Sequence, residues 1–407
     1  MRRATGVGRL VNWALVGVVL LGVGACAPSA APSRPPSAGA SPPQAASAPA
    51  ASGSTGQNAS PGAGAAASPA ASGPADWDAT VAAARQEGKL VISAPTGQLW
   101  REALEAFTQD YPGISLEMTG GNSRDFWPRL FQERDAGQFL WDLRVGGPDP
   151  EVFDARDRGA LDPVRPLLVL PEVMDESKWF GGFDGMYADK AKEYLPAFVA
   201  SASYNVYVNR NVIPESELSS EEQLIDPRWR GKIVIQDPRG GAGLGTTTTQ
   251  LAAFGEDYVR QLFTQQDVVV TGDNRQQAEW VVRNRYPIGI GLRMDQVKVF
   301  EQQGLAVNVQ GLGTPRKLSL GSGGIQLISQ RPHPNAAKVF VNWLLTQKEQ
   351  ERIAKAVETN SRRLDVPPGD MSELLEPSQM AQYVPHQYEE LLPTRRRAQQ
   401  LAAELIK

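Results

Sequence analysis

Four short segments that combine glycine with polar or arginine side chains are the residues best suited to hold a small molecule. Each directly follows an apolar run. Glycine lets the backbone approach a ligand closely, asparagine and serine add hydrogen bonds, and arginine can bind a carboxylate or phosphate through two parallel hydrogen bonds. The candidate residues are Thr96, Gly97, Gly121, Asn122, Ser123, Arg124, Gly147, Asp237, Arg239, Gly240 and Gly241. This pattern predicts noncovalent binding of a polar or anionic organic solute.

Three further candidates lie outside these segments. Arg293 follows another apolar run, and Ser203 and Tyr204 lie in the extended run 197–209. Ordinary turns explain single glycines equally well, and an arginine is most often a surface residue. Tyr204 also fits a role in packing. The candidates therefore gain weight as a set and not one by one.

Covalent catalysis is not indicated. The sequence has no Gly-x-Ser-x-Gly nucleophile elbow, no His-Glu-x-x-His zinc motif, no Cys-x-x-Cys pair and no phosphate loop. The run GGAGLG (240–245) lacks the dinucleotide-binding spacing, because Thr246 stands where the third glycine belongs. We expect no enzyme, no catalytic residue and no cofactor. A membrane-anchored enzyme is the less favoured alternative.

The elements that would position the candidates form two sets of α/β units, in which apolar runs alternate with amphipathic segments of helix length. The apolar runs are 89–95, 114–121 and 141–147 in the first set, and 231–238, 267–273 and 286–291 in the second. Such alternation predicts parallel strands, and ligands bind beyond the carboxyl ends of parallel strands, near helix N-termini. The run 197–209 is long enough to cross between the sets. We predict an α/β fold with two lobes, with hinges near 200–209 and 317–328.

The N-terminus has the layout of an export signal. Arg2, Arg3 and Arg9 precede the apolar residues 13–23, a run too short to cross the roughly 30 Å hydrocarbon layer. Cys26 is the only cysteine, and the sequence Val-Gly-Ala-Cys resembles the bacterial lipobox, which implies cleavage before Cys26 and lipidation of its sulfur. The residues that follow are almost all Ala, Pro, Ser and Gly, a composition that cannot offset the entropy of ordering.

Six segments resemble, in order and spacing, the extracellular solute-binding proteins of ABC importers. They are AAARQEGKLVISAPTG (82–97), FTQDYPGISLEM (107–118), ERDAGQFLWDLRVGG (133–147), YNVYVNRNVIP (204–214), LIDPRWRGKIVIQDP (224–238) and HPNAAKVFVNWLLTQKEQE (333–351). The group resembled is the type 2 periplasmic-binding family that includes ferric-ion-binding proteins. The resemblance implies two α/β lobes joined by hinge strands, a ligand held in the interlobe cleft, and lobe closure that presents the complex to a permease.

The chain is accordingly divided into a signal peptide (1–25), a lipid-anchored disordered linker (26–75) and a solute-binding domain (76–407). Lobe 1 is expected at about 76–200 with part of 317–370, and lobe 2 at about 205–316 with part of the C-terminal helices. The implied partners are a small-molecule solute, an ABC permease and, through Cys26, the cell membrane. We expect an extracytoplasmic monomer. A net charge of −4 provides no basic field for nucleic acid.

The sequence departs from the ferric-binding members, which hold their metal with adjacent tyrosines, a histidine and a carboxylate. It contains no adjacent tyrosine pair, and its two histidines, His333 and His386, lie before a predicted helix and in the tail. We therefore expect no metal ligands, and direct ferric binding is not favoured. The alternative function is a ligand-free adhesin or scaffold on the same fold, whose cleft would be filled by the protein's own large side chains.

The lipobox assignment predicts that a Cys26→Ser precursor loses its lipid, because serine offers no thiol for modification. We expect this variant to leave the membrane fraction at least in part. Cell fractionation and the mass of the mature N-terminus measure the outcome. A variant that still partitions wholly with membranes contradicts lipidation at Cys26.

Overall fold

The computed structural model describes residues 74–313 and 315–406, all within one compact unit, Ala67–Lys407. The predicted signal peptide, Cys26 and nearly all of the predicted linker lie outside the described residues. Within them, no helix has both the length and the apolar character that a membrane crossing requires.

A five-stranded mixed sheet forms the first lobe. Its strand order is β2 (Ser115–Gly120), β1 (Lys89–Ala94), β3 (Leu143–Val145), β12 (Ile325–Ile328) and β4 (Leu161–Asp162). Strand β1 runs parallel to β2 and β3, while β12 is antiparallel to β3 and β4. The helices of this lobe include α1 (Pro74–Glu87), α2 (Gln98–Glu105), the short α3 (Phe107–Asp110), α4 (Ser123–Asp135), α5 (Pro150–Asp157), α11 (Pro334–Leu344) and α12 (Gln347–Ala356).

A second five-stranded sheet forms the other lobe, in the order β10 (Val309–Gly311), β6 (Val206–Asn209), β9 (Ile288–Ile290), β7 (Ile233–Gln236) and β8 (Val269–Thr271). Strand β7 is parallel to β8 and β9, and β6 is antiparallel to β9 and β10. The helices of this lobe are α8 (Gly241–Gln265), α9 (Asn274–Val282) and α10 (Met294–Gln302). The last helix, α13 (Leu392–Leu405), packs along α8.

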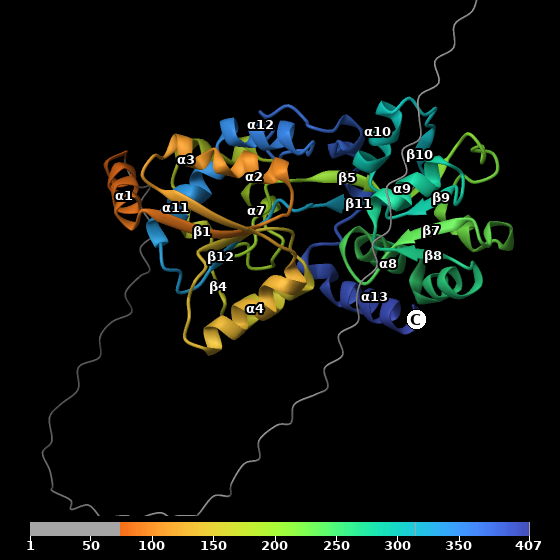
Figure 1. The fold of residues 1–407 in the computed structure, drawn as a ribbon, viewed down its shortest axis with the longest axis horizontal. Helices are drawn as coiled ribbons and strands as arrows, with labels where there is room; N and C mark the ends of the chain where they lie inside the picture. Colours follow the sequence, from red (N-terminus) through yellow and green to blue (C-terminus); the bar gives the residue numbers. More distant parts are fainter. Residues whose placement is uncertain (1–73, 314, 407) are drawn as a thin grey trace, which may run out of the picture. The chain divides into compact units, whose positions relative to one another are not determined.

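A small sheet connects the two lobes, in the order β13 (Tyr383–Val384), β11 (Arg316–Ser319) and β5 (Ser201–Tyr204). Only Asn205 separates β5 from β6, so the chain passes directly from one lobe to the other, and the antiparallel strand β11 brings it back to β12. Figure 1 shows β5 and β11 between the lobes. The predicted two-lobed α/β fold with hinge strands is confirmed.

Short helices complete the architecture. The α-helices are α6 (Pro171–Met174) and α7 (Gly182–Met186), and the 3₁₀ turns are Arg165–Leu167, Glu176–Lys178, Glu221–Ile225, Pro227–Trp229, Met371–Glu373, Pro377–Gln382 and Glu389–Leu391.

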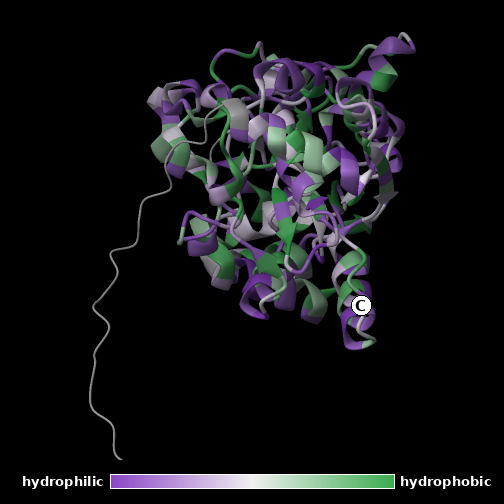
Figure 2. Ribbon diagram, turned by 90° about the vertical axis from the view of Figure 1, so that its left-hand side faces the viewer, coloured by the Kyte–Doolittle hydropathy of each residue, from purple (hydrophilic) through white to green (hydrophobic). Residues whose placement is uncertain are grey.

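The central strands are buried on both faces, as expected where helices cover a sheet. Consecutive residues are buried in both sheets: Ile92, Ser93 and Ala94 of β1, and Ile233, Val234 and Ile235 of β7. Figure 2 shows hydrophobic stretches along the interior strands and hydrophilic stretches on the surrounding helices. Burial of these apolar side chains holds each sheet in place, and the strand ends that carry the site are fixed with it.

The threonine run 246–249 lies inside α8, which begins five residues earlier, at Gly241. The four threonines are fully buried, and the hydroxyl of Thr247 donates to the Gly243 carbonyl oxygen (3.0 Å). The glycines before the run tolerate the helical conformation here because the surrounding lobe supplies the stability that their propensity lacks.

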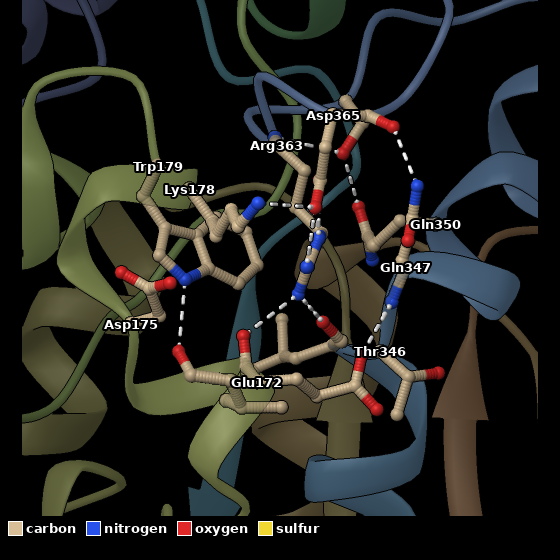
Figure 3. A network of polar contacts seen from close by, with 12 residues as sticks. Glu172, Asp175, Lys178, Trp179, Thr346, Gln347, Gln350, Arg363 and Asp365 are labelled. Carbon is tan, nitrogen blue, oxygen red and sulfur yellow. Dashed lines mark hydrogen bonds and ion pairs between the residues drawn. The ribbon is translucent and has the colours of Figure 1, made fainter.

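The buried side chain of Arg363 connects the segment after α12 to the rest of the first lobe (Figure 3). The Arg363 guanidinium donates to both carboxylate oxygens of Asp365 (2.9 Å each) and to the carbonyl oxygens of Leu345 (3.0 Å) and Glu172 (3.2 Å). The Arg363 Cζ atom also lies 5.2 Å from the centroid of the Trp179 ring. One side chain therefore connects the segments after α12, around α6 and around Trp179.

Replacing Arg363 by alanine should destabilise the protein by about 2–4 kcal/mol, because it leaves Asp365 and two carbonyl oxygens without their donor. Urea unfolding of the chain without its signal segment measures the loss. The control is Arg230→Ala, which breaks an exposed pair with Asp267 and should change stability little. Equal effects of the two substitutions would contradict the structural role of Arg363.

Candidate functional site

A cavity of about 340 Å³ lies between the lobes, a volume within the range of small-molecule sites. The first lobe contributes Asn122, Ser123, Arg124, Asp149, Pro150 and Glu151 to its lining. The second lobe contributes Gln236, Asp237, Arg239, Gly240, Gly241, Leu244 and Gly272, and α13 contributes Gln399. The lining thus gathers the starts of three helices, α4, α5 and α8, each of which follows a strand.

The N-terminus of α4 is fixed by its own polar side chains. Asn122 is the N-cap, and its Oδ1 accepts from the Asp125 N–H (3.1 Å). The buried Ser123 hydroxyl donates to Asp149 Oδ2 (2.9 Å), which connects the starts of α4 and α5. This arrangement holds the first-turn N–H groups of α4, which have no acceptors within the helix, at the cavity wall.

The second-lobe wall is the turn from β7 into α8. Arg239 donates from Nε and Nη2 to the two carboxylate oxygens of Asp237 (2.9 and 2.7 Å), and these hydrogen bonds hold the pKa of Asp237 below its usual value. Gly241 has a φ of +56°, a conformation that favours glycine. Gly243 donates its N–H to Gln236 Oε1 (3.1 Å), so the end of β7 also orients the first turn of α8.

Arg124 reaches across the cleft to the start of α8. A Cβ atom on Gly240 would lie within 3.0 Å of the Arg124 Nε, Cζ and Nη2 atoms, so a side chain at this position would displace the guanidinium. Gly240 is the N-cap of α8, which is interrupted at Gly255 (φ +81°) and whose N-terminal end carries a partial positive charge. The nearby Asp237 carboxylate offsets part of this positive charge, because the Arg124 charge helps to lower the pKa of Asp237. A bound anion would offset more of it.

Helix α13 and the start of α5 supply residues that the sequence analysis missed. Arg395, 3% exposed, donates to Asp149 Oδ1 (2.7 Å) and to the Pro148 carbonyl oxygen (2.9 Å), and Gln399 lies one turn further along the same face. The Asp149-Pro150 pair after the third apolar run is a helix-start signal, and it could have indicated Asp149 as a site residue. No local signal marks Gln399, because its place depends on how α13 docks.

Seven sequence candidates line the cavity and seven do not: the structure brings together Asn122, Ser123, Arg124, Asp237, Arg239, Gly240 and Gly241. Thr96 and Gly97 are exposed in the loop before α2. Gly121 donates its N–H to the Ala94 carbonyl oxygen (3.0 Å), and a Cβ on Gly147 would come within 2.6 Å of the Gly321 carbonyl oxygen. These two glycines therefore serve close backbone packing.

The other candidates have structural partners. The Tyr204 ring packs against Tyr207, with centroids 5.9 Å apart, and under the Arg316 guanidinium carbon at 4.2 Å. Ser203 lies beside the Glu373 carboxylate, whose pKa is raised by burial and is lowered in part by Ser203. Arg293 stands at the N-cap of α10 and pairs with Asp295 (3.0 Å), away from the cavity lining.

The hinge contains buried ionisable groups. The Glu221 carboxylate accepts from Asn205 Nδ2 (3.0 Å) and Gln250 Nε2 (3.1 Å), and burial raises its pKa to about 7. Lys317 of β11 donates to Thr246 Oγ1 (2.8 Å), and burial lowers its pKa to about 8. The buried ring of His386 packs against Gly245, and burial also lowers its pKa. His386 therefore packs against α8, although the sequence placed it only in the tail.

The described part of the chain comprises residues 74–313 and 315–406. Among these residues, no three or more histidine, cysteine, aspartate or glutamate side chains gather in a way that could hold a metal ion. His333 lies at the start of α11, where its Nδ1 lies 2.8 Å from Asp142 Oδ2.

Comparison with known proteins gives consistent matches. Residues 92–351 match the family of bacterial extracellular solute-binding proteins. Iron uptake protein A1 of a Synechocystis species is 22% identical over 264 residues, covering 60% of this chain and 67% of its own. Iron-bound HitA from Pseudomonas aeruginosa (TM-score 0.61, 16% identity) matches 78% of this chain and 99% of its own. AfuA from Actinobacillus pleuropneumoniae with bound fructose-6-phosphate (TM-score 0.58, 18% identity) matches 78% of this chain and 98% of its own. These structures share the fold.

The buried Glu221 gives a prediction for the pH dependence of stability. Its folded pKa of about 7 exceeds the ordinary value of 4.5, so the folded state keeps a proton that the unfolded state has lost between these values. The contribution of the Glu221 carboxyl to the free energy of unfolding is thus fully present below pH 4.5 and is lost as the pH rises through 7. Relative to Glu221→Gln, the native chain should lose on the order of 3 kcal/mol over this range.

Urea unfolding of both proteins at pH 4.5, 5.5 and 7 measures the difference. The glutamine can be accommodated, because Asn205 Oδ1 and Gln250 Oε1 have no partner among the described residues. Glu222→Gln, at the exposed neighbouring position, should follow the native chain. A constant difference between Glu221→Gln and the native chain at all three pH values would disprove the raised pKa.

Proposed function

Since the chain belongs to the family of bacterial extracellular solute-binding proteins, we propose that it captures a small anionic solute between its lobes and delivers it to an ABC permease. Members of this family are binding receptors and not enzymes. The observation that carries the proposal is the Arg124 guanidinium packed against the N-terminus of α8. An anion bound there would meet a cation and unpaired helix N–H groups together.

The chemistry of the cavity favours an organic anion over a bare ferric ion. Arginines, side-chain amides and glycine N–H groups face the cavity, and these are donors suited to carboxylate or phosphate oxygens. The iron named for HitA would need hard oxygen or imidazole ligands. The fructose-6-phosphate named for AfuA carries a phosphate ester, which is an anion of the favoured kind.

The open cavity also favours a receptor over a ligand-free scaffold. A scaffold would be expected to fill its cleft with large side chains, whereas Leu244 is the only large apolar residue among those lining this one. We propose that solute binding to both lobes favours their closure about the hinge strands β5 and β11.

Membrane attachment is part of the same proposal. A diacylglycerol on Cys26 would anchor the mature chain, and the Ala/Pro/Ser/Gly-rich segment after it would act as a flexible tether. Such a tether would hold the receptor near its permease while leaving the lobes free to rotate.

Native mass spectrometry of the gently purified chain tests the function first. A small mass that is present before denaturation and lost after refolding would support a receptor and would identify its solute. If no mass co-purifies and neither carboxylates nor phosphates raise the melting temperature, the receptor proposal fails.

The role of Arg124 gives a quantitative prediction. Arg124→Gln removes the charge that faces α8 and should weaken binding of the co-purified solute by about 10- to 100-fold, as measured by isothermal titration calorimetry. Arg293→Gln is the matched control, since Arg293 is an arginine at another helix start that is paired with Asp295 and does not line the cavity. Equal loss in both variants would exclude a specific anion contact at Arg124.

A further inference from the structure

The charges inside the cavity are largely neutralised by partners within the protein. Asp237 is held by Arg239 through contacts as short as 2.7 Å. Asp149 accepts from Ser123 Oγ (2.9 Å) and from the buried Arg395 (2.7 Å). Both carboxylates are therefore occupied before any solute arrives.

Two charged side chains of the lining have no hydrogen-bond partner among the described residues. Within residues 74–313 and 315–406, neither Arg124 nor Glu151 has a side-chain hydrogen bond or ion pair. Glu151 is half-buried in the first turn of α5. The buried Arg144 lies near enough for its charge to act on Glu151, but its Nη1 donates to Gln326 Oε1 (3.0 Å). The Glu151 oxygens remain free to accept.

We propose that the solute is amphoteric, with an anionic group at Arg124 and an ammonium or similar cationic group at Glu151. This inference rests on the proposed receptor function and specifies its solute class. A purely anionic solute in a cavity of about 340 Å³ would bring negative charge toward the Glu151 carboxylate. An ammonium group turns this repulsion into attraction and donates hydrogen bonds to the free oxygens.

Gln399 supplies a third free polar group. It is half-buried, lines the cavity and makes no side-chain hydrogen bond within the described residues. Helix α13 is fixed by Arg395 on the first lobe and by Arg397, which donates to Glu256 (2.7 and 2.9 Å), on the second. The amide can donate and accept, so it suits an uncharged polar part of the solute between the two charged groups.

A glutamate in the first turn of a helix also has a purely structural explanation, because it complements the helix dipole. The two explanations differ in a measurable way. A structural role changes stability and affects all solutes alike, whereas recognition changes the preference for solutes that carry an amine.

The test uses two pairs of probes that differ only in an amine: phosphoethanolamine against ethyl phosphate, and β-alanine against propionate. Titration calorimetry with the mature chain should show at least tenfold tighter binding of the aminated member in one pair. Glu151→Gln should reduce this ratio to near one, and Glu151→Asp should retain part of it. Glu176→Gln, at an exposed helix-start glutamate outside the cavity lining, should leave the ratio unchanged.

The outcomes separate this inference from the receptor proposal. Equal binding of aminated and plain probes overturns the amphoteric solute but leaves an anion receptor standing. A ratio that survives in Glu151→Gln also overturns it. Binding of none of the four probes overturns the amphoteric solute, while a co-purified anion detected by native mass spectrometry would still support the receptor.

Discussion

Parallel strand pairing is the constraint on which the site depends. Parallel strands end at the same edge of a sheet, so the helices that follow them begin at that edge. In the first lobe β2 leads into α4 and β3 into α5, and in the second β7 leads into α8. The starts of these three helices line one cavity because the hinge strands set the two edges against each other.

This geometry brings several charged side chains into one cavity, and the protein pairs only some of them with an opposite charge. Asp237 is paired with Arg239 and Asp149 with Arg395, which leaves these pairs close to neutral. Arg124, by contrast, has no ion-paired carboxylate among the described residues and lies against the positive end of α8, where the charge of Asp237 offsets its own only in part. A preformed cluster of positive groups costs folding stability, and an anionic ligand is the species that would offset this cost.

The cavity is lined by the two lobes and by helix α13. Its first turns contact the first lobe through Arg395, while Leu401 lies in the core of the second lobe. Because Gln399 lies between these anchors, the last helix in the chain forms part of the cavity wall. Opening of the lobes would have to break the contacts of α13 with one of them. Ion pairs hold α13 on both sides, Arg395 with Asp149 on the first lobe and Arg397 with Glu256 on the second.

The sequence by itself determined the strands, the glycine-bearing turns after them and the two-lobed α/β class, because apolar periodicity and turn residues are local signals. It located Asn122–Arg124 and Asp237–Gly241 for the same reason, since each directly follows a predicted strand. Only the tertiary structure decided that Arg124 faces Gly240, that Arg395 neutralises Asp149 and that Tyr204 packs in the hinge. Arg316 over the Tyr204 ring, Arg124 beside Gly240 and Arg395 on Asp149 join residues between 112 and 246 positions apart, and pairings over such distances depend on how whole elements dock.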